Sequence, residues 1–265
     1  MNRKLIVTDM DGTLLGKDYL LSDYSKTILR ELEEAGNLVV LCSGRPERSI
    51  TPYYHSIGLK NSPFIAYNGI LIVDGTNNEN LFIKKFPHKK VIKIIENYRD
   101  ILISISLETK DTLYLFNEDK NLNNFFPYDG MKVIKDPKPE EIKEDLFTFI
   151  FKVDDDKYPA LEKEIFNKYG LYLRHWTHEP YAELYWPDAT KKEAVEFIKD
   201  MYQIKTEDII AFGDSLNDDG MLSVAGISFV SLDSKSDLLK EKYLTTIDTA
   251  KNDGVAKTLA KLFKL

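Results

Sequence analysis

Three short apolar runs, each followed at once by polar residues and glycine, constrain the fold of this chain more than any other feature. The runs span residues 5–8, 38–42 and 208–212. Continuous aliphatic and β-branched runs of this length are typical of strands that are buried on both faces of a parallel sheet. Apolar residues recur at helical spacing over 23–35 and 191–202, between and around these runs. The alternation predicts an α/β fold with a parallel sheet.

The middle of the chain has a different pattern. Longer runs of alternating polar and apolar residues predict strands at 101–107, 112–116, 147–153, 171–176 and 181–186. Helical patterns separate only some of them, so we expect mostly antiparallel pairing in an α+β insertion. The polar segment 121–124 is expected to be a loop. An earlier hairpin is predicted around Asn68-Gly69, a pair that favours tight turns.

Size and charge narrow the classes of function. The 265 residues suit one large or two modest domains, and a net charge of -7 without a basic block gives no reason to expect a nucleic-acid or membrane partner. The single cysteine, Cys42, cannot form an internal disulfide, and no apolar stretch is long enough to span a membrane. We therefore expect a cytoplasmic protein.

Acidic and hydroxyl residues cluster just after the three predicted strands: Asp9 and Asp11, Ser43, then Asp214 and Asp218. The carboxyl ends of parallel strands meet at one edge of the sheet, where ligands bind. Carboxylates gathered there repel one another unless a cation sits among them, and Mg²⁺ prefers such oxygen ligands together with a substrate phosphate. The residues predict a site that handles phosphoryl groups.

The first cluster also indicates a reaction. No Gly-x-x-x-x-Gly-Lys-[Ser/Thr] loop is present, so a nucleotide cradle of that type is absent. Asp9 and Asp11 are two residues apart, a spacing that places side chains on the same side of an extended chain. One carboxylate can attack phosphorus, and the other can protonate the leaving oxygen and then activate water. Lys191 could balance the charge of the transferred group.

These motifs resemble those of haloacid dehalogenase superfamily phosphatases, in the Cof-like branch with a C2-type (IIB) cap. The resemblance runs along the whole chain in order, through Asp9-Met10-Asp11-Gly12-Thr13, Ser43-Gly44-Arg45, Asn68-Gly69, Thr190-Lys191, Gly213 to Asp218 and Asn252 to Ala256. It implies a Rossmann-like core of residues 1–82 and 188–265, the catalytic domain. It also implies an inserted cap, 83–187, that selects the substrate.

The resemblance further implies roles for single residues. Asp9 would be the nucleophile and Asp11 the general acid and base, while Mg²⁺ would be held by Asp9, Asp214 and the Asp11 carbonyl, supported by Asp218. The phosphate would be bound by Met10, Thr13, Ser43, Gly44, Lys191 and Asn217. Further candidates for substrate binding are Arg45, Asn68, Tyr181, Glu183 and Tyr185. The last three share one face of the predicted strand 181–186, for which ordinary cap surface and substrate contact are both open interpretations.

The sequence departs from the family pattern at three positions. Ser43 stands where threonine is usual, and keeps the hydroxyl. Lys192 stands where glycine usually follows the catalytic lysine; Lys191 is favoured because it keeps the family spacing from Pro187. Pro52, inside the helix expected after Pro46, should distort or end that helix.

The function that follows is a Mg²⁺-dependent phosphomonoester hydrolase acting through an aspartyl phosphate on small phosphorylated metabolites, with sugar phosphates the leading class. A phosphotransferase or phosphomutase would use the same intermediate with another acceptor. A non-catalytic sensor of phosphorylated metabolites is an alternative of a different class. A monomer and a small homo-oligomer are both compatible with the sequence.

Overall fold

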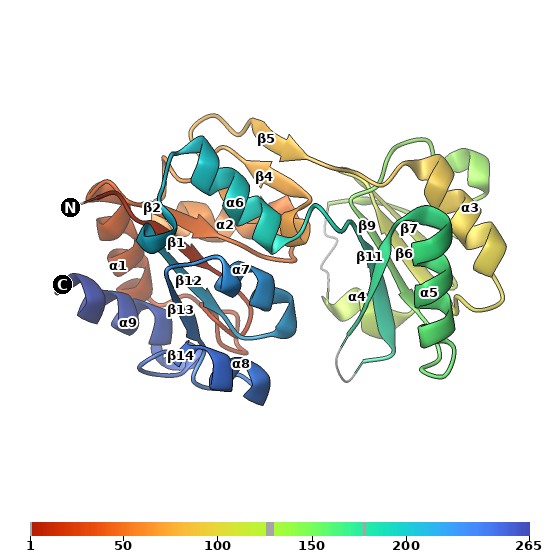
Figure 1. Ribbon diagram of the computed structural model, residues 1–265. Helices are drawn as coiled ribbons and strands as arrows, with labels where there is room; N and C mark the ends of the chain where they lie inside the picture. Colours follow the sequence, from red (N-terminus) through yellow and green to blue (C-terminus); the bar gives the residue numbers. More distant parts are fainter. Residues whose placement is uncertain (1, 126–129, 177–178) are drawn as a thin grey trace. The chain divides into compact units, whose positions relative to one another are not determined.

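The computed structural model describes residues 2–125, 130–176 and 179–265, and the chain folds into two compact units. The core unit comprises Met1–Ile83 and Ala189–Leu265, and the inserted unit comprises Lys84–Asp188 (Figure 1).

The core unit is built on a five-stranded sheet in the order β14-β13-β12-β1-β2, with every pair parallel. Its strands are β1 (Leu5–Thr8), β2 (Leu38–Leu41), β12 (Ile209–Gly213), β13 (Ile227–Val230) and β14 (Leu244–Thr245). Strand β1, which lies between β12 and β2, is buried along its whole length, as its unbroken apolar run predicted. The α/β fold class with a parallel sheet is confirmed.

Helices cover both faces of this sheet, with α6 and α7 on one side and α1 and α9 on the other (Figure 1). The helices are α1 (Asp23–Glu34), α2 (Glu47–Ile57), α6 (Lys191–Met201), α7 (Asp219–Ser223), α8 (Asp237–Lys242) and α9 (Gly254–Phe263). Val195 and Ile198 of α6 share a core cluster with Val7 and Ala211 of the sheet. Cys42 is fully buried in the same cluster.

A three-stranded antiparallel sheet extends the core unit, with β3 (Phe64–Ala66), β4 (Leu71–Val73) and β5 (Asn80–Ile83) in that order. The turn between β3 and β4 contains Asn68 at φ 57° and Gly69 at φ 109°. Asparagine and glycine tolerate this left-handed region better than other residues, which is why the pair predicted the hairpin correctly.

The expectation that Pro52 would end its helix is wrong, because α2 continues for five residues beyond it, to Ile57. A proline removes one backbone hydrogen bond from a helix and crowds the preceding turn. Pro52 lies on the exposed side of α2, where water can replace the missing donor, while Ile50 and Tyr54 remain buried.

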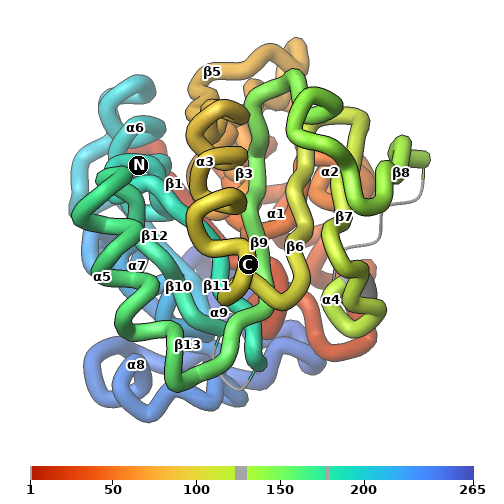
Figure 2. The backbone as a smooth tube through the Cα atoms, turned by 90° about the vertical axis from the view of Figure 1, so that its right-hand side faces the viewer, coloured from red at the N-terminus to blue at the C-terminus, as the bar shows by residue number. Residues whose placement is uncertain are grey.

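The inserted unit is built on a six-stranded sheet in the order β10-β11-β9-β6-β7-β8. Its strands are β6 (Ser104–Glu108), β7 (Thr112–Phe116), β8 (Lys132–Lys135), β9 (Thr148–Lys152), β10 (Tyr172–His175) and β11 (Tyr181–Tyr185). Figure 2 shows β9, β6 and β7 side by side at its centre. Helices α3 (His88–Tyr98) and α5 (Tyr158–Tyr169) lie on one side of the sheet (Figure 1). Four of the five strand pairs are antiparallel, as predicted.

Two features of this unit differ from expectation. Residues 121–124 are not a loop, because they belong to helix α4 (Lys120–Phe125). That helix connects β7 to β8, a strand that the sequence pattern did not predict and that pairs parallel to β7. A parallel pair needs a crossover connection, and a short polar helix carries too little periodic pattern to be recognised.

Within the described residues, the longest helices have only twelve residues, and none combines the length and apolar character of a membrane span.

Candidate active site

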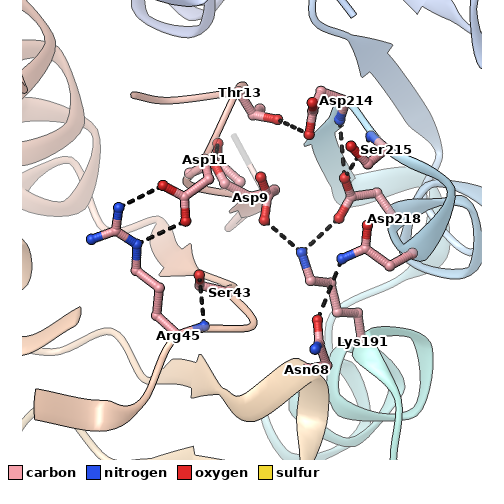
Figure 3. Close-up of polar contacts among 12 residues, drawn as sticks. Asp9, Asp11, Thr13, Ser43, Arg45, Asn68, Lys191, Asp214, Ser215 and Asp218 are labelled. Atoms are coloured by element: carbon pink, nitrogen blue, oxygen red, sulfur yellow. Dashed lines mark hydrogen bonds and ion pairs between the residues drawn. The ribbon is translucent and has the colours of Figure 1, made fainter. Parts of the chain in front are cut away.

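The carboxyl ends of β1, β2 and β12 bring the predicted site residues to one edge of the core sheet. Thr8 at the end of β1 is in register with Leu41 on one side and Phe212 on the other. The residue that follows β1 is Asp9, whose backbone N–H donates to the Phe212 carbonyl at 2.9 Å. Parallel pairing therefore places Asp9 between the segment that begins at Ser43 and the segment that begins at Asp214 (Figure 3).

Lys191 reaches this edge from the first position of α6. Its side chain is only 1% exposed, and its Nζ donates to Asp9 Oδ1 at 2.5 Å and to Asp218 Oδ1 at 2.6 Å. Burial lowers the pKa of Lys191, but the neighbouring Asp218 and Asp9 carboxylates more than offset this and raise it above its ordinary value. Lys192 is half-buried elsewhere, so the structure places Lys191, and not Lys192, against Asp9.

The hairpin turn helps to place the start of α6. A Cβ at Gly69 would lie 2.2 Å from the Thr190 carbonyl oxygen, a distance that no side chain could occupy. Thr190 is the N-cap of α6, with its side chain accepting from the Lys192 N–H. A glycine at this turn therefore lets the hairpin approach the helix end that carries Lys191.

Asp218 connects the lysine to the loop after β12. One carboxylate oxygen accepts from Lys191, and the other accepts backbone N–H groups of Asp214 at 3.0 Å and Ser215 at 3.1 Å. Asp218 is completely buried. Asp218 therefore fixes the shape of this loop and also contacts Lys191, the lysine that donates to Asp9.

Carboxylate oxygens of Asp9, Asp214 and Asp218 lie within 4.8 Å of one another, close enough to share a metal ion. Burial raises the pKa of Asp9 well above its ordinary value even though Lys191 lowers it, and burial next to Asp218 raises that of Asp214 to about 7. Thr13 Oγ1 lies 3.5 Å from Asp214 Oδ1. Two buried carboxylates and one half-buried carboxylate beside a single ammonium leave excess negative charge, which a divalent cation would neutralise.

Asp11 directs its carboxylate away from this group. It forms a two-pronged ion pair with Arg45, in which Nε donates to Oδ2 at 2.7 Å and a terminal nitrogen donates to Oδ1 at 2.5 Å (Figure 3). The Asp11 side chain is 42% exposed. The two predicted catalytic carboxylates therefore occupy different surroundings, one buried against a lysine and one open to solvent.

The remaining predicted phosphate ligands surround the same edge. Ser43 is buried, and its Oγ accepts from the Arg45 N–H at 3.1 Å. Its carbonyl accepts from the backbone N–H of Asn68 at 3.0 Å. The Asn68 side chain in turn accepts from Asn217 at 3.4 Å and would meet any Cβ at Gly44. Met10, between the two aspartates, is fully buried.

The three predicted cap residues, Tyr181, Glu183 and Tyr185, belong to the inserted unit and line one face of β11. Tyr181 is buried and its hydroxyl donates to Asp119 at 3.1 Å. Glu183 forms an ion pair with Arg174 of the neighbouring strand. Tyr185 is half-buried, and its ring stacks on that of Tyr172 with the centroids 5.5 Å apart. All three are thus engaged within their own unit.

Comparison with known proteins shows the family. Residues 6–259 match the family model for haloacid dehalogenase-like hydrolases. The chain belongs to this family. It is 27% identical to the 5-amino-6-(5-phospho-D-ribitylamino)uracil phosphatase YitU of Bacillus subtilis (strain 168), over 98% of both chains. It is 30% identical to the phosphatase YcsE of the same organism, named for the same substrate, over 97% of this chain and 94% of the relative. The predicted phosphatase class is confirmed.

Solved structures show the same fold. A haloacid dehalogenase-like hydrolase from Bacteroides thetaiotaomicron has a TM-score of 0.83 at 23% identity, covering 99% of this chain and 100% of the other. TM0651 from Thermotoga maritima has a TM-score of 0.81 at 21% identity, covering 98% and 97%.

The sequence reasoning missed two residues beside the site, Tyr19 and Tyr53. Their rings lie against the Arg45 guanidinium, with centroids 5.2 and 5.4 Å from its Cζ. They come from the loop after β1 and from α2, segments with no periodic relation to each other. The contact arises only when the chain folds, so no sequence signal could have found it.

Proposed function

We propose that this phosphatase is a Mg²⁺-dependent phosphomonoesterase that acts through an aspartyl phosphate on Asp9. The observation that supports this most strongly is the arrangement around Asp9. Its buried carboxylate lies directly after β1, contacts the Lys191 ammonium at 2.5 Å and shares a cluster with Asp214 and Asp218. A buried carboxylate so held is poised to act as a nucleophile.

The residues present fit a hard divalent cation. Oxygen is the atom that all three clustered carboxylates offer, and Mg²⁺ prefers oxygen ligands. We propose that Asp9 and Asp214 hold the ion together with the Asp11 carbonyl, and that Asp218 supports them through the loop it orders. When bound, Mg²⁺ would offset the charge of the phosphate and the carboxylates.

The chain's own groups account for the proton transfers. Asp9 attacks phosphorus while the bond from phosphorus to the ester oxygen breaks, and protonated Asp11 gives its proton to that oxygen. Asp11 then takes a proton from water as the water attacks the phosphorus of the aspartyl phosphate. Inorganic phosphate leaves, and the Asp9 carboxylate and the Asp11 proton are restored. Lys191 stabilises charge on the transferred group.

We propose that the phosphate oxygens bind at the edge formed by three segments. Ser43 with the Gly44 amide, the Asn217 amide side chain, Lys191, and the segment from Met10 to Thr13 would supply the donors. Hydroxyl, amide and ammonium groups of this kind recognise phosphate, and glycine lets the backbone approach it closely.

We propose sugar or sugar-alcohol phosphates as the substrate class. The two Bacillus subtilis relatives are named for a phosphate ester on a ribityl chain, a sugar-alcohol counterpart of the sugar phosphates expected from the sequence, and this supports the proposal. The core unit would bind the phosphate, with Arg45 and Asn68 beside it. The inserted unit would select the leaving group, with Tyr181, Glu183 and Tyr185 as candidate contacts.

Phosphate release from a panel of sugar, sugar-alcohol and nucleotide phosphates, with and without Mg²⁺, tests the proposal. We expect Mg²⁺-dependent release with the highest kcat/KM for a sugar or sugar-alcohol phosphate. Asp9→Asn should lose at least about 10³-fold in kcat. Asp200→Asn, at a 76% exposed aspartate, is the matched control and should keep full activity.

Mass analysis of the acid-quenched peptide that contains Asp9 should show the phosphoryl adduct during turnover. Transfer of phosphate to an added sugar in preference to water would indicate the phosphotransferase. Binding without any turnover, or full turnover by Asp9→Asn, would overturn the proposal.

A further inference from the structure

The Asp11 carboxylate is oriented by a single side chain within the described part of the chain. Both of its oxygens accept from Arg45, at 2.7 and 2.5 Å, and its side chain is 42% exposed. A partly exposed carboxylate keeps a fixed direction only where its partner is itself held in place, because two flexible side chains must otherwise be ordered against competition from water. The direction of the Asp11 carboxylate therefore depends on what holds Arg45.

Two tyrosines hold it. The Arg45 Cζ lies 5.2 Å from the ring centroid of Tyr19 and 5.4 Å from that of Tyr53, both within the range of a cation–π contact. The Arg45 side chain is only 20% exposed. We call Tyr19, Tyr53 and the Arg45 side chain between them the tyrosine clamp.

A hydrogen bond joins the two tyrosines of the clamp. The Tyr53 hydroxyl donates to the Tyr19 carbonyl at 2.8 Å, which joins α2 to the loop after β1. Tyr19 has φ 55°, a left-handed conformation that is uncommon for a residue with a bulky side chain. Its N–H donates to the Gly16 carbonyl at 2.9 Å and so closes a turn. A residue kept in such a conformation at the edge of a site, and bonded by its neighbours, points to a functional constraint.

We infer that Tyr19 and Tyr53 are positioning residues for departure of the leaving group: they fix Arg45, and Arg45 keeps hold of one Asp11 oxygen while the other carries the proton. The inference rests on the proposed role of Asp11 as the general acid. It goes beyond that role because it makes two aromatic residues outside the sequence motifs control the direction in which Asp11 gives its proton.

A specific kinetic consequence follows from the chemistry. An alkoxide leaving group needs a proton as the bond to phosphorus breaks, whereas p-nitrophenolate leaves readily without one. A misdirected Asp11 therefore slows alkyl phosphates more than p-nitrophenyl phosphate. The ratio of the two kcat/KM values reports this, because kcat/KM covers the steps up to departure of the leaving group.

The experiment compares kcat/KM for glycerol phosphate and p-nitrophenyl phosphate, with saturating Mg²⁺, in Tyr53→Leu and Tyr19→Leu. We expect the alkyl-to-aryl ratio to fall about tenfold in each, the scale of a misplaced catalytic group. Tyr19→Phe keeps the ring and should restore the ratio, because Tyr19 uses only its ring and its backbone in the clamp. Tyr24→Leu, at another exposed tyrosine of the core unit, is the matched control and should leave both rates unchanged.

Asp11→Asn, measured in parallel, separates the two levels of the proposal. If Asp11→Asn lowers the ratio strongly while both leucine variants keep it, the clamp has no positioning role and the proposed function stands. If Asp11→Asn also leaves the ratio unchanged, the proposed general acid is wrong and the clamp inference fails with it. Equal losses for both substrates in the leucine variants, with Tyr19→Phe no better than Tyr19→Leu, would show general damage to the fold and would likewise overturn the inference.

Discussion

Both units contain a partly or fully buried aspartate paired with a lysine. The pKa of the aspartate is raised in the core unit and lowered in the inserted unit. In the core unit, burial raises the pKa of Asp9 although Lys191 is 2.5 Å away. In the inserted unit, burial raises the pKa of Asp119, but the Asn121 N–H, Lys152 and the Tyr181 hydroxyl more than offset this and lower it. The first carboxylate shares its lysine with Asp218, whereas the second is surrounded by donors.

This difference separates a cluster with unneutralised charge from one whose charge is satisfied by its own neighbours. The core cluster holds more negative charge than its own lysine neutralises, and the cation that we propose there would offset it. The Asp119 cluster satisfies its carboxylate internally and stabilises the inserted unit. Four predictions test the contrast, in order of decreasing effect.

Removing the core lysine should have the largest effect. Lys191→Met leaves Asp9 and Asp218 buried without their cation, and breaking one partner of a buried ion pair typically costs about 3–5 kcal/mol. We expect kcat/KM for p-nitrophenyl phosphate to fall about 10³-fold and the midpoint of urea unfolding to drop. Lys192→Met, one residue along and half-buried, is the control. A loss below tenfold in Lys191→Met would show that this lysine does not stabilise the transferred group.

Removing one carboxylate of the cluster should weaken the metal site. Asp214→Asn should raise the Mg²⁺ concentration for half-maximal activity by about 10²-fold, since it deletes a charged ligand. Isothermal titration with Mg²⁺ alone measures the same loss without turnover. Asp200→Asn, an exposed change of the same chemistry, should leave the titration as it is. Unchanged Mg²⁺ binding in Asp214→Asn would place the metal elsewhere.

A change in the inserted unit should alter selectivity and spare the chemical step. Glu183→Ala on β11 removes the ion pair with Arg174 of β10, and we expect the relative kcat/KM values of the sugar phosphates to shift about tenfold. The rate with p-nitrophenyl phosphate should stay the same. Glu140→Ala, at an exposed glutamate of the same unit, is the control. If Glu183→Ala gives the wild-type substrate profile, β11 is ordinary surface.

The smallest expected effect is on acid stability. The folded pKa of Asp119 lies below its unfolded value of about 3.9, so its contribution is complete above that pH and is lost as the pH falls through the folded value. In Asp119→Asn, the unfolding midpoint of the inserted unit should therefore be lower than wild type at neutral pH and should approach it below about pH 4. Tryptophan fluorescence follows this unit, because Trp176 and Trp186, the two tryptophans of the chain, both lie in it. A difference that stays constant down to the lowest pH would exclude the carboxylate as the cause.

Much of the core unit could be read from the chain because local patterns and tertiary contacts agree there. The buried strand Leu5–Thr8 and the Asn68-Gly69 hairpin appear where they were predicted. The inserted unit was harder, since the short helix α4 and the edge strand β8 have no strong apolar period. Pro52 was misjudged because sequence does not show which side of a helix faces water.

The motifs of the chain alone determined the fold class, the family and the residue types at the site, because buried strands and the polar residues after them are local features of sequence. Tertiary structure decided how those residues share their charges. It paired Lys191 with both Asp9 and Asp218, turned Asp11 toward Arg45, and enclosed Arg45 between two tyrosines. Such partnerships join segments far apart along the chain, and the direction of a side chain is fixed only when its neighbours pack around it.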